Sequence, residues 1–268
     1  MEYLYYFESN KKNHFIHEHQ PEEVKGYPYI FLNPIFDEKK RSQRFYSETA
    51  RELCCNGIPV IRFDYYGTGD SYGQLYEMNL ESTIYTIKDL IDKVVKKYCC
   101  SKINLLGLRI GADIALNITK CYSENVNNVF LIEPVIIGKR FLLEQRSRRK
   151  MFFKINNMTN VQEKVIIDGK SFEDHQGYLI SAENQHFLNN LDSTEVYFSE
   201  KKVIIIKLNT ISSKKNMNQL KEKLIKNNSV LYYNFDYPAF WSILEPINTQ
   251  SLSKTIIGKI LFVSDIYH

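Results

Sequence analysis

The stretch "LLGLRIGADIAL", residues 105–116, decides how this chain folds. It begins with an apolar run that suits a buried strand and ends with apolar residues at helical spacing. Gly107 and Gly111 stand two positions on either side of Arg109. Glycine suits both positions because a sharp turn from strand to helix brings the two backbones close together. The stretch therefore predicts a strand, a tight turn centred on Arg109 and a helix.

The segments around this stretch alternate between strand-like and helix-like patterns. Continuous apolar runs predict buried strands at 27–33, 58–64, 102–108 and 128–134. Apolar residues three and four apart predict helices at 41–56, 80–95 and 110–122. This alternation is typical of an α/β fold with a mostly parallel central sheet and helices on both faces. Near the start, "YLYYFES" and "HFIHEH" flank "NKKN" and predict an antiparallel N-terminal hairpin.

The alternation stops at residue 138 and resumes at 201. There "KKVIIIKL" (201–208) and "SVLYYNF" (229–235) predict strands, and helices are expected at 214–227 and 251–266. We therefore expect one domain over 1–268, with 138–200 inserted between two strands of the sheet. Insertions at the carboxyl end of a strand lie where ligands bind, and they often form lids. Within this insertion, 139–150 carries six basic groups and one acid, which indicates a solvated helix face.

The composition limits the kinds of partner that the chain has. A net charge of +4 is too small to indicate nucleic-acid binding, and no run of 18 apolar residues predicts a membrane span. The five cysteines lack disulfide or metal-site spacing and are typical of free thiols in a cytoplasmic protein. The glycine-rich loop "DYYGTGDSYG" (64–73) lacks the spacing of a dinucleotide-binding loop. We expect no nucleic acid, metal or other cofactor, and a cytoplasmic location.

These motifs, in this order, resemble the α/β-hydrolase superfamily and its serine-aminopeptidase-like branch. Within that branch, the chain is similar to the second type of hydrolase associated with the exosortase A system. The matching stretches are "NPIFDEKKRSQR" (33–44), "RFDYYGTGDSYG" (62–73), "GLRIGA" (107–112), "PVIIG" (134–138), "GYLIS" (177–181) and "PAFW" (238–241), followed by Glu245. The resemblance covers residues 3–246 and implies an α/β-hydrolase fold with a lid or cap insertion. The family it resembles also has arginine at the position of Arg109.

The catalytic residues that this fold implies are missing from their expected places. A serine hydrolase of this fold uses Ser, then Asp or Glu, then His, in that order along the chain. Arg109 stands at the serine position, and it stays protonated, so it cannot act as a nucleophile or an ordinary base. The acid would fall at Asn209 or Thr210, and "DYPAFWSILEP" (236–246) lacks the late histidine. The resemblance therefore implies a hydrolase fold with a degenerate triad.

Three other side chains are alternatives for the missing groups. We interpret Ser71, in the glycine-rich loop, as a hydroxyl that stabilises the loop. His175 and His186 lie in the insertion, which covers the site in this fold. We interpret both of them as exposed or structural histidines.

Two roles for Arg109 remain open. Its fixed charge at a helix N-terminus, beside the free N–H of Ile110, suits an anion such as a carboxylate, phosphate or sulfate. The alternative, which we favour, is an internal ion pair with Glu133 or Glu245, because a buried arginine without a partner is costly. Both roles are compatible if an anionic ligand and the protein carboxylate bind Arg109 together.

We expect an accessory protein that does not use a serine triad and that binds an anionic small-molecule or peptide-like ligand. The alternative is an active hydrolase or acyltransferase-like enzyme of unconventional mechanism, with Arg109 as electrophile and Glu133 or Glu245 as base. A protein partner from the same pathway is also expected. The residues expected to contact the ligand are Ile35, Phe36, Arg109, Ile110 and Trp241.

Overall fold

The computed structural model describes residues 1–158, 164–208, 214–243 and 248–263. Its core, within these residues, is a sheet of eight strands in the order β1-β2-β4-β3-β5-β6-β10-β11. The pairs β1–β2 and β2–β4 are antiparallel and the other pairs are parallel. The strands are β1 (Glu2–Ser9), β2 (Lys12–His19), β3 (Tyr29–Leu32), β4 (Val60–Phe63), β5 (Ile103–Leu108), β6 (Val126–Ile132), β10 (Lys202–Lys207) and β11 (Ser229–Asn234). This confirms the predicted mostly parallel sheet and its N-terminal hairpin.

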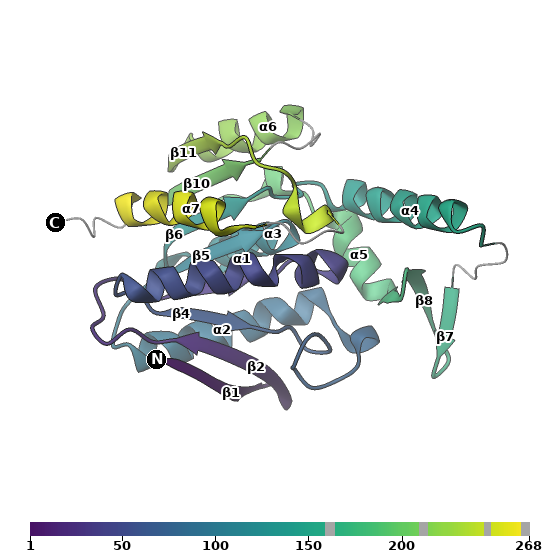
Figure 1. Cartoon of the computed structure of the whole chain (residues 1–268), viewed down its shortest axis with the longest axis horizontal. Helices are drawn as coiled ribbons and strands as arrows, with labels where there is room; N and C mark the ends of the chain where they lie inside the picture. Colours follow the sequence, from purple (N-terminus) through teal and green to yellow (C-terminus); the bar gives the residue numbers. More distant parts are fainter. Residues whose placement is uncertain (159–163, 209–213, 244–247, 264–268) are drawn as a thin grey trace.

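Helices cover both faces of the sheet (Figure 1). Neighbouring residues of β5 point to opposite faces, so Leu105 and Leu106 belong to two different apolar cores. Because both faces are covered, the central strands are apolar throughout, as the sequence pattern predicts. On the face of Leu106 lie α1 (Phe36–Cys55) and α7 (Gln250–Val263), and on the face of Leu105 lie α2 (Leu80–Lys97), α3 (Ile110–Cys121) and α6 (Lys214–Leu224).

The observed helices lie within a few residues of their predicted bounds, except at the start of α1. This helix begins at Phe36 rather than at residue 41. Its first turn is charged, so a pattern based on apolar spacing does not detect it. Asp37 and Glu38 lie in that turn, where acidic side chains interact favourably with the positive end of the helix dipole.

Residues 138–158 and 164–191 follow β6 and lie beyond the carboxyl ends of the parallel strands (Figure 1), whereas Glu200 lies at their amino ends, where β10 begins. The segment returns to its starting point at residues 191–193, since Gly138 N–H donates to Leu191 O (2.9 Å) and Ser193 N–H donates to Ile136 O (2.8 Å). It is therefore anchored beside the turn from β5 into α3. The segment's main elements are α4 (Gly138–Ile155), the antiparallel strands β7 (Lys164–Ile167), β8 (Lys170–His175) and β9 (Tyr178–Ile180), and α5 (Ala182–Asn190).

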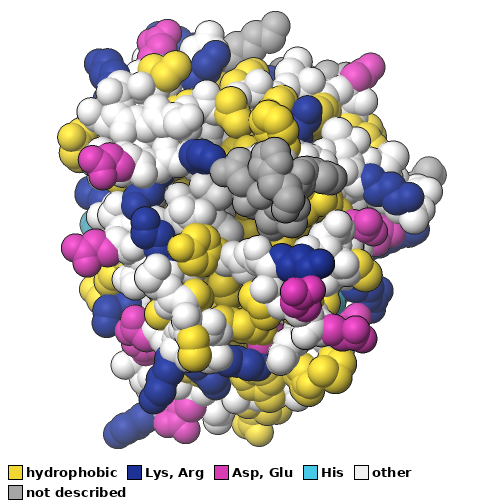
Figure 2. Space-filling model, turned by 90° about the vertical axis from the view of Figure 1, so that its left-hand side faces the viewer, with side chains coloured by type: hydrophobic (Ala, Val, Ile, Leu, Met, Phe, Trp, Pro, Cys, Tyr) yellow, Lys and Arg dark blue, Asp and Glu magenta, His cyan; other side chains and the backbone are white. Residues whose placement is uncertain are grey.

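The surface carries charges of both signs. Figure 2 shows the face at the left of Figure 1, where Lys and Arg side chains are interspersed with Asp and Glu. Mixed charge of this kind does not produce the strong field of one sign that steers a charged polymer. In the described part of the chain, no helix combines the length and the apolar character needed to cross a membrane.

Candidate functional site

Arg109 lies at the centre of the turn between β5 and α3. Its backbone has φ 55° and ψ −126°, in a region that residues other than glycine rarely adopt. Backbone hydrogen bonds hold this conformation: Arg109 N–H donates to Ile132 O (3.0 Å), and Arg109 O accepts from the N–H groups of Ala112 (2.9 Å) and Asp113 (3.4 Å). The side chain is 8% exposed, so its charge needs partners inside the protein.

Those partners are Glu38 on α1 and Glu144 on α4. Arg109 Nε lies 3.3 Å from both carboxylate oxygens of Glu38, and Nη2 lies 3.3 Å from Glu144 Oε2. The expected internal ion pair of Arg109 is confirmed, but the expectation that Glu133 is the partner is wrong. Arg109 pairs instead with Glu38 and Glu144. Glu245 lies outside the described residues.

The two acids differ in their surroundings. The Glu38 side chain is 2% exposed, whereas that of Glu144 is 42% exposed. Burial raises the pKa of the Glu38 carboxyl, against the opposing effect of the Arg109 charge. Burial lowers the pKa of Arg109, but Glu38 and Glu144 outweigh it and raise that pKa overall. Glu38 is therefore a fixed partner, whereas Glu144 can turn toward solvent.

Aromatic rings surround the Arg109 guanidinium. Its central carbon lies 5.5 Å from the ring centre of Trp241 and 6.0 Å from that of Phe141, within cation–π range. Phe36 stacks on Phe141 with ring centres 6.1 Å apart. Of the predicted ligand contacts, the structure thus brings Phe36, Arg109 and Trp241 together. Ile110, the first residue of α3, is fully buried beside them.

Glu133, at the end of β6, has a different set of interactions. Its carboxylate accepts a hydrogen bond from Leu208 N–H (2.6 Å) and lies 3.6 Å from Lys207 Nζ. The residue is fully buried, and its attraction for Arg109 is weaker than that of Glu38 or Glu144. Glu133 therefore joins the ends of β6 and β10, which does not favour a role as a base.

The alternative catalytic side chains are held in structural contacts or exposed. Ser71 Oγ donates to Asp64 O (2.6 Å) and accepts from Phe15 N–H (2.8 Å), which confirms its role in the loop. His175 is buried, with Nε2 2.9 Å from a Glu173 oxygen, and its ring is parallel to that of Phe36. His186 is exposed on α5. The triad-acid positions, Asn209 and Thr210, lie outside the described residues.

Asp113 is a site residue that the sequence reasoning missed. It lies one turn after Arg109 and is fully buried. Its carboxylate accepts from the N–H groups of Val135 (2.9 Å) and Ile136 (3.0 Å) and from Ser193 Oγ (2.5 Å). Burial raises the pKa of Asp113 to about 6, although these three donors oppose the shift. Asp113 thus ties the chain just before residue 138, and again at Ser193, to α3.

Two cavities adjoin these residues. One of about 100 Å³ lies between Arg109, Arg140 and Glu144, and Phe141 forms part of its wall. A second, of about 310 Å³, is lined by Ile35 and Phe36, together with residues of the glycine-rich loop. The predicted contacts Ile35 and Phe36 therefore line a cavity next to the Arg109 cluster.

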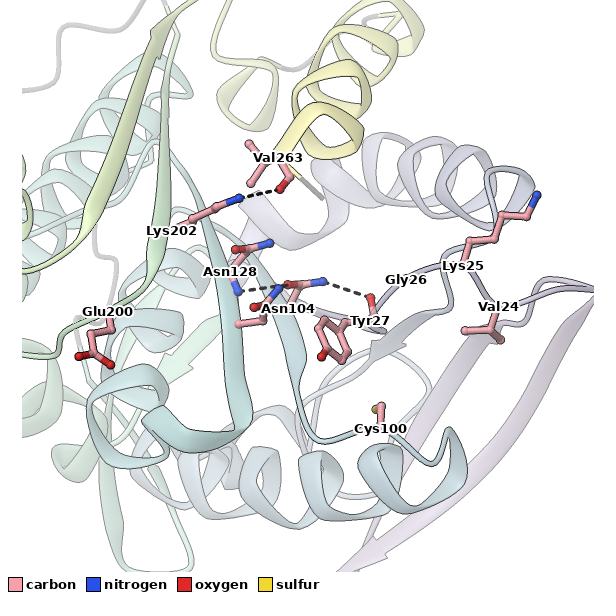
Figure 3. A pocket seen from close by; sticks show the side chains of 11 residues that line it. Val24, Lys25, Gly26, Tyr27, Cys100, Asn104, Asn128, Glu200, Lys202 and Val263 are labelled. Carbon is pink, nitrogen blue, oxygen red and sulfur yellow. Dashed lines mark hydrogen bonds between the residues drawn. The ribbon is translucent and has the colours of Figure 1, made fainter. Parts of the chain in front are cut away.

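A cavity of about 630 Å³, larger than these two, lies at the amino ends of β5, β6 and β10 (Figure 3). None of the predicted site residues lines it. Asn104 donates to Tyr27 O and accepts from Asn128 N–H, both at 3.1 Å, so this buried amide already has partners in the protein. We therefore place the candidate site at Arg109 rather than in this larger cavity.

Comparisons with known proteins agree with this fold. No curated protein sequence matches the chain. Similar solved structures include DcsB in complex with its substrate analogue (TM-score 0.69, 10% identity, 99% of this chain and 100% of that chain). A second is a soluble variant of monoglyceride lipase from Saccharomyces cerevisiae (TM-score 0.67, 13% identity, 99% of this chain and 96% of that chain). A third is Est1E from Butyrivibrio proteoclasticus with bound ferulic acid (TM-score 0.64, 13% identity, 96% of this chain and 99% of that chain). At these identities the likeness shows the α/β-hydrolase fold alone.

The family is shown by the sequence itself. The family model described as "Serine aminopeptidase, S33" matches residues 39–188, which is more than half of the chain. The match includes most of α1, the glycine-rich loop, the Arg109 turn and most of the 138–200 segment. The chain therefore belongs to the serine aminopeptidase S33 family.

Proposed function

We propose that this chain has the α/β-hydrolase fold with a degenerate triad, and that Arg109 binds the anionic group of a small-molecule or peptide-like ligand. One observation carries the proposal: a carboxylate already occupies this place. Glu144 lies against Arg109 Nη2 at 3.3 Å and against Arg148 Nη2 at 2.6 Å, and Arg140 lines the same cavity. A ligand carboxylate or phosphate takes the place of Glu144 among these three cations.

The remainder of the ligand lies along the apolar residues beside Arg109. Phe36 connects the two cavities, because it lines the larger one and stacks on Phe141, which lines the smaller. Ile35, Ile110 and Trp241 complete the proposed contact surface. The 138–200 segment acts as a lid, since its helix α4 carries both Glu144 and Phe141.

We also propose that the chain belongs to the branch that resembles the exosortase A system-associated hydrolases. The matching stretches at 33–44 and 62–73 support this placement. In that role it is an accessory of an export or biosynthetic pathway with a protein partner. A cytoplasmic location is supported by the five free cysteines.

A fluorophosphonate probe tests the absence of a serine nucleophile. The wild-type chain is expected to stay unlabelled, because Arg109 stands at the serine position and the hydroxyl of Ser71 is held by the backbone of Asp64 and Phe15. Intact-protein mass spectrometry measures the labelling. A stoichiometric adduct on any serine would overturn the proposal and would favour an active hydrolase.

Anion binding is tested with the Glu144→Gln variant. Removing the internal carboxylate frees one side of Arg109, so inorganic phosphate or acetate is expected to bind roughly two- to fivefold more tightly than to the wild type. Isothermal titration calorimetry measures both affinities.

The matched control is Arg140→Gln, which removes a cation of the same cavity and is expected to weaken binding. Glu195→Gln, an exposed acid of the same segment, is expected to have no effect. If neither anion binds wild type or Glu144→Gln, or if Arg140→Gln binds as well as wild type, Arg109 serves only as an internal ion pair.

A further inference from the structure

A second cluster of chemically active side chains lies far from Arg109, on the N-terminal hairpin. His17 and His19 are two residues apart on β2, so their side chains lie on the same face of the sheet. The antiparallel register of β1 and β2 places Glu2 directly opposite His19. Two imidazoles and one carboxylate therefore lie together on one patch of the sheet.

The three side chains converge. Glu2 Oε2 lies 2.7 Å from His17 Nε2, and Glu2 Oε1 lies 3.6 Å from His19 Nδ1. The two imidazole rings stack with centres 4.3 Å apart. One ligand atom from each residue lies within 4.8 Å of the other two, a spacing that allows all three to reach a single ion after small side-chain rotations.

His19 supplies an independent observation that a ligand belongs here. Its side chain is 1% exposed, and neither of its ring nitrogens has a hydrogen-bond partner in the described structure. A buried polar group without a partner is unfavourable, and buried imidazoles usually bond to protein, water or metal. The Nδ1 atom faces the Glu2 carboxylate, toward the centre of the cluster.

We propose that Glu2, His17 and His19 bind one divalent transition-metal ion of the Zn²⁺ class. Imidazole nitrogens and a carboxylate oxygen are ligands that zinc accepts, and three protein ligands leave a fourth position for water. His17 is 21% exposed and Glu2 39% exposed, so the ion has a path from solvent.

Two arginines set limits on this site. Arg51 Nε donates to Glu2 Oε1 (2.8 Å), and Arg62 Nη1 lies 3.5 Å from His17 Nδ1. Glu2 can bind the ion through Oε2 while Oε1 keeps Arg51, which is the usual arrangement of a carboxylate ligand with a hydrogen bond behind it. Arg62 opposes the ion by its charge, so the site binds more weakly than one free of nearby cations.

The test uses the full chain, freed of metal by a chelator and titrated with Zn²⁺ alone by calorimetry and by thermal unfolding. We expect binding of one ion and a rise in Tm, because the ion binds the folded hairpin and not the unfolded chain. Glu2→Gln and His17→Gln, both partly exposed, are expected to fold and to lose about tenfold or more in affinity. His19→Gln is expected to show the same loss.

His186→Gln is the matched control, since His186 is exposed on α5, and it is expected to bind as the wild type does. Because the cysteines are free, the titration is repeated after alkylation of the thiols. The proposal is overturned if wild type shows no binding, if Glu2→Gln and His17→Gln bind as tightly as wild type, or if alkylation alone removes the binding.

Discussion

Replacing Arg109 with methionine is expected to destabilise the folded chain by about 3–5 kcal/mol. The substitution keeps much of the side-chain volume but leaves Glu38, which is 2% exposed, as a buried charge without its main partner. Glu144 adds little to this loss, because it is partly exposed and keeps Arg148 as a second partner. Urea unfolding at neutral pH measures the change in the free energy of unfolding.

A double-mutant cycle separates the ion pair from simple packing. Glu38→Met alone is also expected to destabilise, since it leaves Arg109 with the weaker partner Glu144. The double variant Arg109→Met with Glu38→Met is expected to recover most of the loss, because two apolar side chains replace a buried pair without leaving a charge. Glu144→Gln, the matched control, is expected to change stability by less than about 1 kcal/mol. Additive losses in the double variant would mean that Glu38 is not a charged partner of Arg109.

The sequence predicts the strand, turn and helix that carry Arg109 better than it predicts the side chains that contact Arg109. Periodicity is local, so the strand, turn and helix of 105–116 are predicted from neighbouring residues alone. The partner of Arg109 depends instead on how α1 crosses the sheet. A usable signal was present: Glu38 shares helical spacing with Ser42, Phe45 and Thr49, all of which are buried. A carboxylate on the buried face of a helix needs a cation, and this observation would have selected Glu38.

Glu144 and Asp113 were missed for related reasons. The charge pattern of 139–150 indicates a solvated helix face, and most of its charged side chains are partly or fully exposed. Its single acid, Glu144, nevertheless reaches Arg109, because the segment folds back over the turn from β5 into α3. Nothing in the periodicity of an insertion specifies where its ends are anchored. Asp113, an acid within the apolar stretch "GADIAL", marks that anchor by hydrogen bonds that only the folded chain brings together.

The second large effect is expected from Gly111→Ala, which should destabilise the chain by about 3 kcal/mol or more. A Cβ at Gly111 would lie 2.0 Å from Leu32 O and 2.8 Å from Asn33 O, and these backbone atoms cannot rotate away as a flexible side chain can. Both carbonyls are also engaged: Leu32 O accepts from Tyr46 Oη and Asn33 O from Tyr65 Oη, each at 2.8 Å. Making room for one methyl group therefore disturbs the end of β3 and two buried tyrosines.

Gly258→Ala is the matched control, because Gly258 also lies within a helix, α7, but a Cβ there would meet no atom of the described residues outside its own helix within 4 Å. That variant is expected to be stabilised by about 0.5–1 kcal/mol, the usual gain of alanine over glycine in a helix interior. The difference between the two variants in urea unfolding thus isolates the steric contact from helix propensity. If Gly111→Ala is as stable as Gly258→Ala, α3 does not pack against the carbonyls of β3. In that case, close contact between the backbones of α3 and β3 would not be the reason why glycine stands at position 111.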